Sequence, residues 1–375
     1  MKYTPVGRGT SFLFFPAQIS LYFPGSNFLS TRVLTSRPSI SYILIWMTSW
    51  NFYRNSWDNL LNLLVVETNF RRYPMKLKFE DEETLLIWLY VEISKLNAQS
   101  ELPLYTTRFS PNYVPYFTDA ELFTCGIFTE LIRAKDRKAG YKYIVKYYHD
   151  WFPKLPSYSV YNRKLIKYHE AFAYIHKALV KKYGYADQAL AMIDSAPIVV
   201  CQQQHTIHSK AAKPFVTKGY CAAKKEFYIG AKLQVIGVVR TNKLPLPAEF
   251  SLATAEMHDL DIAKEELPDS ELNNIDLYGD KAYKDRAFQL DLFESKGINI
   301  ITPIKKEKGQ ERLSLFQNAS NTIHSSIRQP IDSLFGWINE RTGIEKASTV
   351  RSENGLFYHV AVKMVAALIM MIAEF

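Results

Sequence analysis

The chain has 375 residues, of which 47% are hydrophobic and 22% charged, with 15 Gly and 17 Pro. This composition excludes collagen-like, coiled-coil and wholly disordered proteins, and the length favours two domains. The formal net charge of +9 favours a polyanionic partner, nucleic acid before an anionic membrane surface. The cysteines, Cys125, Cys201 and Cys221, lack C-x-x-C spacing, so they indicate a reducing cytosol and not a disulfide framework.

Residues 1–74 differ from the rest of the chain. They contain seven basic residues and two acidic ones, and their aromatic-rich apolar runs keep neither a strand nor a helix period. A secretory signal is an alternative interpretation, but Pro16 interrupts its apolar patch and no small-residue cleavage site follows. We therefore predict a poorly ordered or mis-started extension, with the folded protein beginning near Met75.

Residues 75–185 have helical patterns and are predicted to form a mainly α-helical DNA-binding region. Thr118 and Glu121 are spaced as a capping box ahead of an apolar stripe. One long helix is expected after Pro156, with apolar residues from Leu165 to Leu179 on one side. Its other side carries basic residues, among them Arg163, Lys164 and Lys167. Such a helix beside aromatic residues suits a helix-turn-helix reader of DNA, and a solvated structural helix explains the charge equally well.

Residues 186–375 change to short strands alternating with helices. Strands are expected at 189–197, 226–239, 246–255, 273–283 and 297–304, and helices at 258–267, 284–297 and 325–343. This order predicts an α/β domain whose mixed sheet has helices on both faces. The apolar segment 356–375 is interrupted by His359 and Lys363 at helical spacing, so we predict a buried core helix and not a membrane span.

Three aspartates fall at positions where such a sheet forms sites. Asp194 lies in or just after the first strand, Asp280 at the end of the fourth, and Asp332 one turn into the last long helix. Sites in open α/β sheets form where strand ends meet helix starts. Each Asp alone is more typical of a cap or turn, but their joint placement on a basic chain predicts a site for two divalent cations that supports phosphoryl transfer.

The strings IDSAP, TAEMHDLD, YGDKAY and IRQPIDSLFGWINERTG resemble the DDE domain of bacterial insertion-sequence transposases. The resemblance covers about residues 117–375 and is closest to insertion-sequence family nine-eighty-two, near the type-four and type-five DDE groups. It implies an α/β ribonuclease-H-like catalytic domain over residues 186–375. It also implies that Asp194, Asp280 and Asp332 are catalytic and bind two Mg²⁺ ions, with Mn²⁺ able to substitute.

The third acid departs from this family's pattern, because the family normally has Glu where this chain has Asp332. The side chain is shorter by one methylene, a loss of roughly 1.5 Å of reach. A misplacement of about 1 Å can slow a reaction about a hundredfold. Glu340, roughly two turns further on, and Glu345 are other acids of this segment. Three residues lie between Arg328 and Asp332. The resembling family places an Arg at this interval before its third acid, which favours Asp332 as that acid.

Other residues are expected to support this site. Arg328 would orient the third acid or the scissile phosphate, Lys281 would contact a flanking phosphate or offset the acids, and His258 with Asp259 would shape the pocket. A lysine-rich hairpin with interspersed aromatics is expected to follow DNA phosphates and to stack on unpaired bases; its lysines include Lys210, Lys213, Lys218, Lys224 and Lys225. A zinc site of Cys201, His205, His208 and Cys221 has an unusual spacing, so we favour structural roles for these residues.

The resemblance implies a DNA transposase that binds terminal inverted repeats, hydrolyses a strand at the element's end and joins the new 3′-hydroxyl to target DNA. Its partner would be double-stranded DNA, on which it would act as a homodimer, and its place would be the cytoplasm, at the nucleoid, with no membrane contact. Two alternatives stay open. One is a decayed copy that only binds DNA, motivated by Asp332, and the other is a nuclease that shares the fold.

Overall fold

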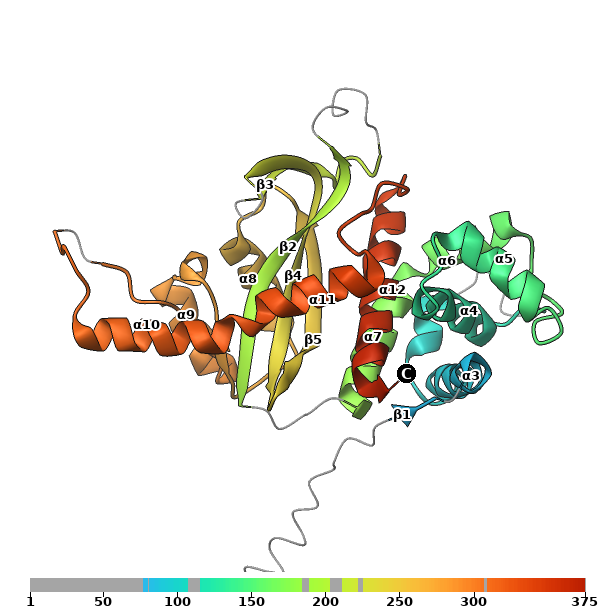
Figure 1. Cartoon of the computed structure of the whole chain (residues 1–375), viewed down its shortest axis with the longest axis horizontal. Helices are drawn as coiled ribbons and strands as arrows, with labels where there is room; N and C mark the ends of the chain where they lie inside the picture. Colours follow the sequence, from blue (N-terminus) through green and yellow to red (C-terminus); the bar gives the residue numbers. More distant parts are fainter. Residues whose placement is uncertain are drawn as a thin grey trace, which may run out of the picture. The chain divides into compact units, whose positions relative to one another are not determined.

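The computed structural model describes residues 77–79, 81–106, 115–183, 189–202, 211–221, 225–306 and 309–374. The predicted extension 1–74 and the residues Lys210, Lys224, His205 and His208 lie outside the described residues. The chain from Pro74 to Phe375 forms one compact unit. Within it, a group of helices precedes a mixed β-sheet that has helices on both faces (Figure 1).

The first part of the described chain is helical, as the sequence predicts. It contains α3 (Glu82–Gln99), α4 (Asp119–Leu131), α5 (Arg137–Tyr147), α6 (Tyr158–Lys167) and α7 (His169–Tyr183), with the short 3-10 helix η2 (Leu102–Thr106). The predicted capping box at the start of α4 is confirmed, because the Glu121 N–H donates to Thr118 Oγ1 at 3.2 Å and the Thr118 N–H to Glu121 Oε2 at 2.6 Å. The predicted apolar stripe from Leu165 to Leu179 is buried, which confirms it as the core-facing side.

The prediction of a single long helix after Pro156 is wrong, because the segment forms two helices, α6 and α7. The helix stops at Lys167 and a new one starts at His169, with Tyr168 between them in a non-helical conformation. The Tyr168 ring is buried edge-on against Phe123, with 6.4 Å between the ring centroids. The apolar period runs on across the break, so the sequence pattern does not reveal the change of direction.

Among the described residues, six strands form the sheet: β2 (Leu190–Gln202), β3 (Thr217–Cys221), β4 (Glu226–Arg240), β5 (Lys243–Thr254), β6 (Asp276–Tyr278) and β7 (Asn299–Ile301). Their order is β3-β4-β2-β6-β7, and β5 also pairs with β4. β4 is antiparallel to β2, β3 and β5, whereas β6 is parallel to both β2 and β7. This confirms the predicted mixed sheet, and the arrangement is consistent with a ribonuclease-H-like fold.

The fourth predicted strand is shorter than expected. β6 ends at Tyr278, and residues Lys281–Tyr283 form the 3-10 turn η5, which Asp280 caps by accepting the Lys281 N–H at 2.6 Å. An aspartate that bonds a following N–H favours a turn over an extended strand. The acid predicted at the strand end therefore sits in a turn just beyond it.

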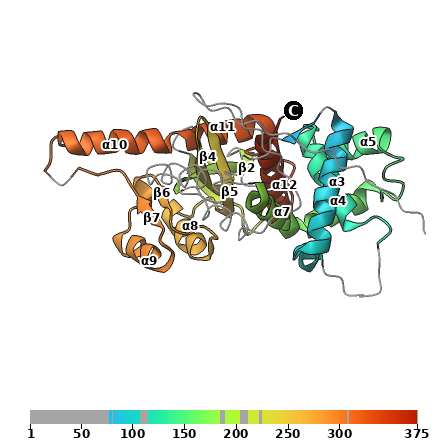
Figure 2. The same cartoon turned by 90° about the horizontal axis from the view of Figure 1, so that it is seen from below.

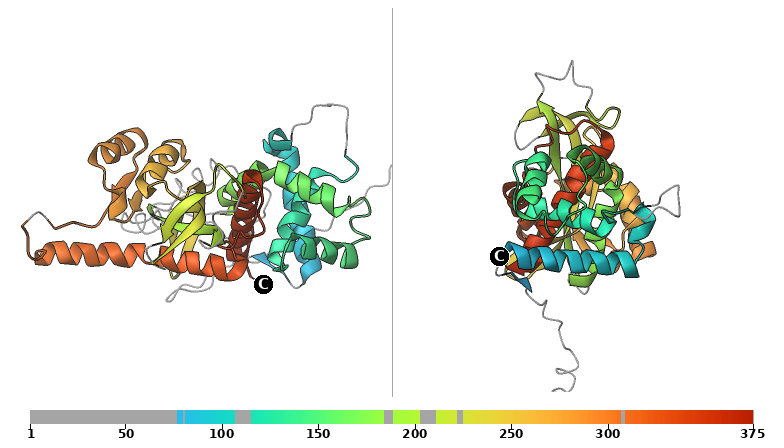
Figure 3. Two further views of the ribbon diagram at one scale, coloured as in Figure 1. Left: turned by 90° about the horizontal axis from the view of Figure 1, so that it is seen from above. Right: turned by 90° about the vertical axis from the view of Figure 1, so that its right-hand side faces the viewer.

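Alternating side chains of the sheet enter two separate cores. On one face, Met192, Ile198 and Leu233 pack with α11 (Pro330–Thr342) and α12 (Glu353–Ile372). On the other face, Ile193 and Ile236 pack with α8 (Asp259–Glu266) and α9 (Arg286–Lys296), helped by the short turn η4 (Leu267–Asp269). Figure 2 and Figure 3 show α11 on one side of the sheet and α8 and α9 on the other, which confirms the prediction of helices on both faces.

The prediction of one helix over residues 325–343 is wrong in its extent, because the end of one helix and the start of another meet within this segment. α10 (Leu315–Arg328) ends before Gln329, and α11 starts at Pro330. Proline has no N–H to continue a preceding helix but fits the first position of a new one. Asp332 therefore lies in the first turn of α11, and Arg328 is the last residue of α10.

Helix α12 is the predicted buried core helix, and the structure confirms it. Its length and hydropathy would suffice to cross a membrane, but 67% of its apolar window is buried inside the protein. Val362, Leu368 and Ile369 of α12 share one core with Phe123 and Phe172 of the helical region. Lys363 pairs with Glu130 of α4 at 2.9 Å, and β1 (Leu77–Lys78) lies parallel to β8 (Ala373–Glu374) after α12. The domain boundary near residue 185 remains a prediction, with α12 packing on both sides of it.

Candidate active site

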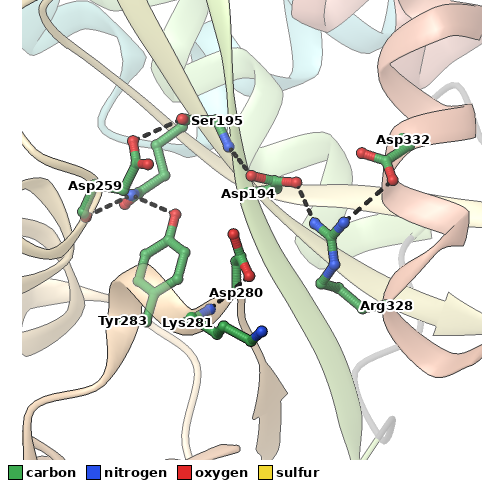
Figure 4. A network of polar contacts seen from close by, with 9 residues as sticks. Asp194, Ser195, Asp259, Asp280, Lys281, Tyr283, Arg328 and Asp332 are labelled. Atoms are coloured by element: carbon green, nitrogen blue, oxygen red, sulfur yellow. Dashed lines mark hydrogen bonds and ion pairs between the residues drawn. The ribbon is translucent and has the colours of Figure 1, made fainter. Parts of the chain in front are cut away.

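Asp194 lies on β2, and Asp280 lies in the turn just after the neighbouring parallel strand β6. The register pairs Met192 of β2 with Tyr278, the last residue of β6; Asp194 lies two residues after Met192 on β2, and Asp280 lies two residues after Tyr278, in the turn that follows β6. Met192 contacts the core that lies under α11 and α12, so the alternation of β2 places Asp194 on that face of the sheet. Figure 4 shows the two carboxylates directed into the same space.

Arg328 connects Asp332 to this pair. Its Nη1 donates to Asp194 Oδ2 at 2.5 Å and its Nη2 to Asp332 Oδ2 at 3.3 Å (Figure 4). The helix break at Gln329 lets one guanidinium at the end of α10 reach both the strand and the start of α11. Glu340 is exposed two turns further along α11. The structure thus joins Asp194, Asp332 and Arg328, and it places Asp280 in the turn after the neighbouring strand.

The charges at this site act on one another. Burial raises the pKa of Asp194, as does the nearby charge of Asp332, while the Ser195 N–H and Arg328 oppose the rise. Burial tends to lower the pKa of Arg328, but the charges of Asp194, Asp332 and Asp280 prevail and raise it. A half-buried carboxylate with a raised pKa binds a cation favourably, because its charge is otherwise poorly solvated.

A second polar network lies behind Asp194, on the opposite face of the sheet. Ser195 Oγ donates to Asp259 Oδ1 at 2.7 Å, and Lys232 Nζ pairs with the same oxygen at 3.1 Å. Asp259 is the first residue of α8, so these contacts fix the start of that helix against β2 and β4. The predicted pair of His258 and Asp259 does lie at a helix start, but only Asp259 belongs to the network, and the His258 side chain is exposed.

The network continues to the turn that carries Asp280. Gln234 Nε2 donates to the Asp259 carbonyl oxygen and to the Tyr283 hydroxyl, both at 3.1 Å, and Gln234 and Tyr283 are buried. Tyr283 closes the turn η5 that begins after Asp280. These contacts tie the turn of Asp280 to the strands beside Asp194. Sequence reasoning missed Ser195, Gln234 and Tyr283. It grouped Lys232 with the hairpin lysines, whereas Lys232 pairs with Asp259; a polar residue at 234 within an apolar strand was a signal.

The other predicted residues are more exposed. The Lys281 side chain is exposed next to Asp280. Arg163 and Lys167 of α6 are exposed and Lys164 is half-buried, whereas Lys213, Lys218 and Lys225 are exposed on or beside the β3–β4 hairpin. The predicted hairpin is therefore confirmed as a structure, and its contact with DNA stays a prediction. Cys201 and Cys221 lie on strands either side of β4, and the described residues contain no zinc-like cluster of His, Cys or acidic side chains.

The donor types at the aspartates suit a hard divalent cation. Carboxylate oxygens are the ligands that Mg²⁺ takes in proteins. In the part of the chain that the structure describes, no three acidic, His or Cys side chains are close enough to hold an ion as they stand. Arg328 now binds one oxygen of Asp194 and one of Asp332. A cation shared by these two aspartates would therefore take the place of the guanidinium.

Comparison with known families agrees with this geometry. Residues 185–349 match the family model described as a transposase DDE domain. The match spans less than half of the chain, from the segment before β2 to the segment after α11, and includes all three aspartates. No curated protein and no solved structure matches the chain at a comparable level. The match supports a DDE transposase as the class of protein to which this region corresponds.

Proposed function

We propose that this chain is the DNA transposase of an insertion sequence of family nine-eighty-two, which binds terminal inverted repeats and cleaves and joins DNA at the element's ends. The observation that carries the proposal is the parallel register of β2 and β6. Its last pair, Met192 and Tyr278, lies two residues before Asp194 and Asp280, inside the segment that matches the DDE family model. Arg328 donates hydrogen bonds to both Asp194 and Asp332, which links Asp332 to Asp194.

In this proposal Asp194, Asp280 and Asp332 hold two Mg²⁺ ions, or Mn²⁺ ions in their place. Such ions, when bound, activate the attacking oxygen and stabilise the leaving oxygen of an in-line phosphoryl transfer. The protein's own part is positioning and charge neutralisation. Arg328 pairs with Asp194 and Asp332, and it would orient the third acid or the scissile phosphate. Lys281, exposed beside Asp280, is placed to contact a flanking phosphate.

The DNA contacts are proposed for two basic groups. One is on α6, with Arg163, Lys164 and Lys167, and the other is the β3–β4 hairpin with Lys213, Lys218 and Lys225, together with Lys210 and Lys224 of the same sequence segment. The net charge of +9 supports a polyanionic partner. Holding two element ends at once would require a homodimer on DNA, and the place of action would be the cytoplasm, at the nucleoid.

Asp332 motivates a second candidate function, a decayed transposase that binds element ends without cutting them. Its side chain is 58% exposed and is one methylene shorter than the Glu usual at this place in the resembling family. If this candidate were correct, the native chain would bind the ends but leave them uncut in Mg²⁺ and Mn²⁺, and Asp332→Glu would restore cleavage.

The proposal is tested by strand cleavage on labelled duplexes made from the DNA that flanks the coding sequence on each side. The native chain is incubated with Mn²⁺ and then with Mg²⁺, beside Asp194→Ala and the control Asp261→Ala, an exposed acid of α8 outside the site. We expect the native chain and the control to nick at a fixed position and Asp194→Ala to leave the DNA intact. Equal cleavage of unrelated duplexes would instead identify a nuclease that shares the fold.

A further inference from the structure

The β3–β4 hairpin carries an exposed pair of aromatic rings. Tyr220 of β3 and Phe227 of β4 are directly opposite each other in the register, and their ring centroids are 5.0 Å apart. Tyr220 is 54% exposed and Phe227 is 47% exposed. Such a cross-strand pair helps to stabilise a hairpin, but buried rings would do this better. The exposed ring faces are therefore available to a planar ligand.

Positive charge surrounds these rings. Lys218 Nζ lies 4.4 Å from the centroid of the Phe227 ring, on the diagonal of the strand pair. From Lys210 to Glu226 the sequence has five lysines and a single acid, Glu226. Lys213, Lys218 and Lys225 form no ion pair with a carboxylate among the residues that the structure describes. Aromatic faces beside unneutralised lysines are the combination that binds the bases and phosphates of single-stranded nucleic acid.

The ring pair lies on the same side of the sheet as the candidate active site. Asp194 pairs with Val235 of β4, and Phe227 is eight residues before Val235 on the same strand. An even separation puts both side chains on one face, and eight residues span at most about 26 Å. At a rise of about 3.4 Å per base pair, this distance corresponds to at most roughly eight base pairs of duplex from the scissile bond.

We propose that Tyr220, Phe227 and Lys218 form a stacking site for unpaired nucleotides of the DNA strand beside the cut. In a paired duplex the base faces are covered by neighbouring bases, so these rings can stack only on bases that are unpaired. Lys218 would contact the adjacent phosphate. The identity of the DNA rests on the proposed function, but the chemistry of the site does not.

The test uses the full chain and two probes. One is an oligo(dT) strand of about 20 nucleotides with a single 2-aminopurine, and the other is a fully paired duplex of the same length. Anisotropy gives the affinity, and quenching of 2-aminopurine reports stacking on a ring. We expect Tyr220→Leu and Phe227→Leu each to weaken single-strand binding about tenfold and to reduce quenching, with little effect on the duplex. Phe293→Leu, at a 55% exposed ring of α9, is the matched control and should change neither.

Further variants separate stacking from folding. Tyr220→Phe keeps the ring and should keep both affinity and quenching. Lys218→Gln should lower the salt dependence of binding while quenching persists. Equal losses on both probes, or no loss on either, would overturn the stacking site. Oligo(dT) binding needs no cleavage, so ring-dependent quenching by a chain that never cuts DNA would refute the proposed function and leave the stacking site intact.

Discussion

At the scale of single residues, the site is the half-buried Asp194 with two supporting groups of contacts. Arg328 offsets the charge of Asp194 on one face of the sheet, and the network through Ser195 fixes the backbone from the other face. Because rate in phosphoryl transfer depends on position within about 1 Å, the second support bears on activity as well as on stability. Two substitutions test this support.

Tyr283→Phe removes the hydroxyl that accepts from Gln234 and leaves one N–H of a buried amide without a partner. We expect the free energy of unfolding to fall by about 1–3 kcal/mol, and strand cleavage to slow because the turn of Asp280 loses an anchor. Urea denaturation and the cleavage assay measure the two effects. Tyr147→Phe, at a 56% exposed tyrosine of α5, is the control. Equal effects of the two substitutions would show that the network does not support the site.

Gly279→Ala tests the packing just before Asp280. A Cβ at Gly279 would lie 2.8 Å from Cδ2 of the buried Tyr283 and 3.2 Å from Cγ2 of Ile193. We expect a loss of about 1–3 kcal/mol in unfolding free energy and slower cleavage. Gly336→Ala is the matched control, because no atom lies within 4 Å of its added Cβ and alanine favours a helix by about 0.5–1 kcal/mol. Thermal or urea unfolding should therefore move in opposite directions for the two variants.

At the scale of elements, α12 completes the core of the helical region. Its Tyr358 packs edge-on against Phe172 of α7, with 5.0 Å between ring centroids. Burying a side chain of this kind contributes about 1.5–3 kcal/mol, and several apolar positions of α7 depend on α12 for their burial. We therefore expect a fragment of residues 75–185 to lack a cooperative urea transition, whereas residues 75–375 unfold cooperatively. A sharp transition of the fragment at a similar midpoint would contradict this.

The sequence predicts some elements better than others, for physical reasons. The strands around Asp194 and Asp280 and the capped helix α4 carry local signals, and the structure has them. The break at Gln329 also had a local signal in Pro330, together with a capping box of Ser314 and Gln317 that begins α10. By contrast, the network of Ser195, Gln234 and Tyr283 joins residues far apart in the chain. No local pattern encodes such contacts, nor the packing of α12 against α7.

At the scale of the whole molecule, the buried His176 and the half-buried His359 make stability depend on pH. Burial lowers the pKa of His176 and of His359 to about 3. Both are neutral in the folded chain near pH 5, while the unfolded chain protonates them below about 6.5, so the unfolded state binds more protons. The free energy of unfolding is therefore unaffected by these histidines above about pH 6.5, and it decreases as the pH falls from 6.5 toward 3.

We expect the free energy of unfolding to fall by about 2 kcal/mol for each histidine between pH 7.5 and pH 5. His176→Gln should remove about half of this dependence, whatever its effect at pH 7.5, and His258→Gln, at an exposed histidine, should leave the dependence unchanged. Urea denaturation at the two pH values measures it. A free energy that is constant or rises on acidification would contradict the account.

We propose that Asp194, with Asp280 and Asp332, cuts DNA at the element's end, and the first experiment is cleavage of the labelled flanking duplex in Mn²⁺. The account predicts nicking at one position by the native chain and none by Asp194→Ala. Nicking by Asp332→Glu alone would keep the site but make end binding the native function. Absence of nicking by both the native chain and Asp332→Glu, or nicking that persists in Asp194→Ala, would contradict the account.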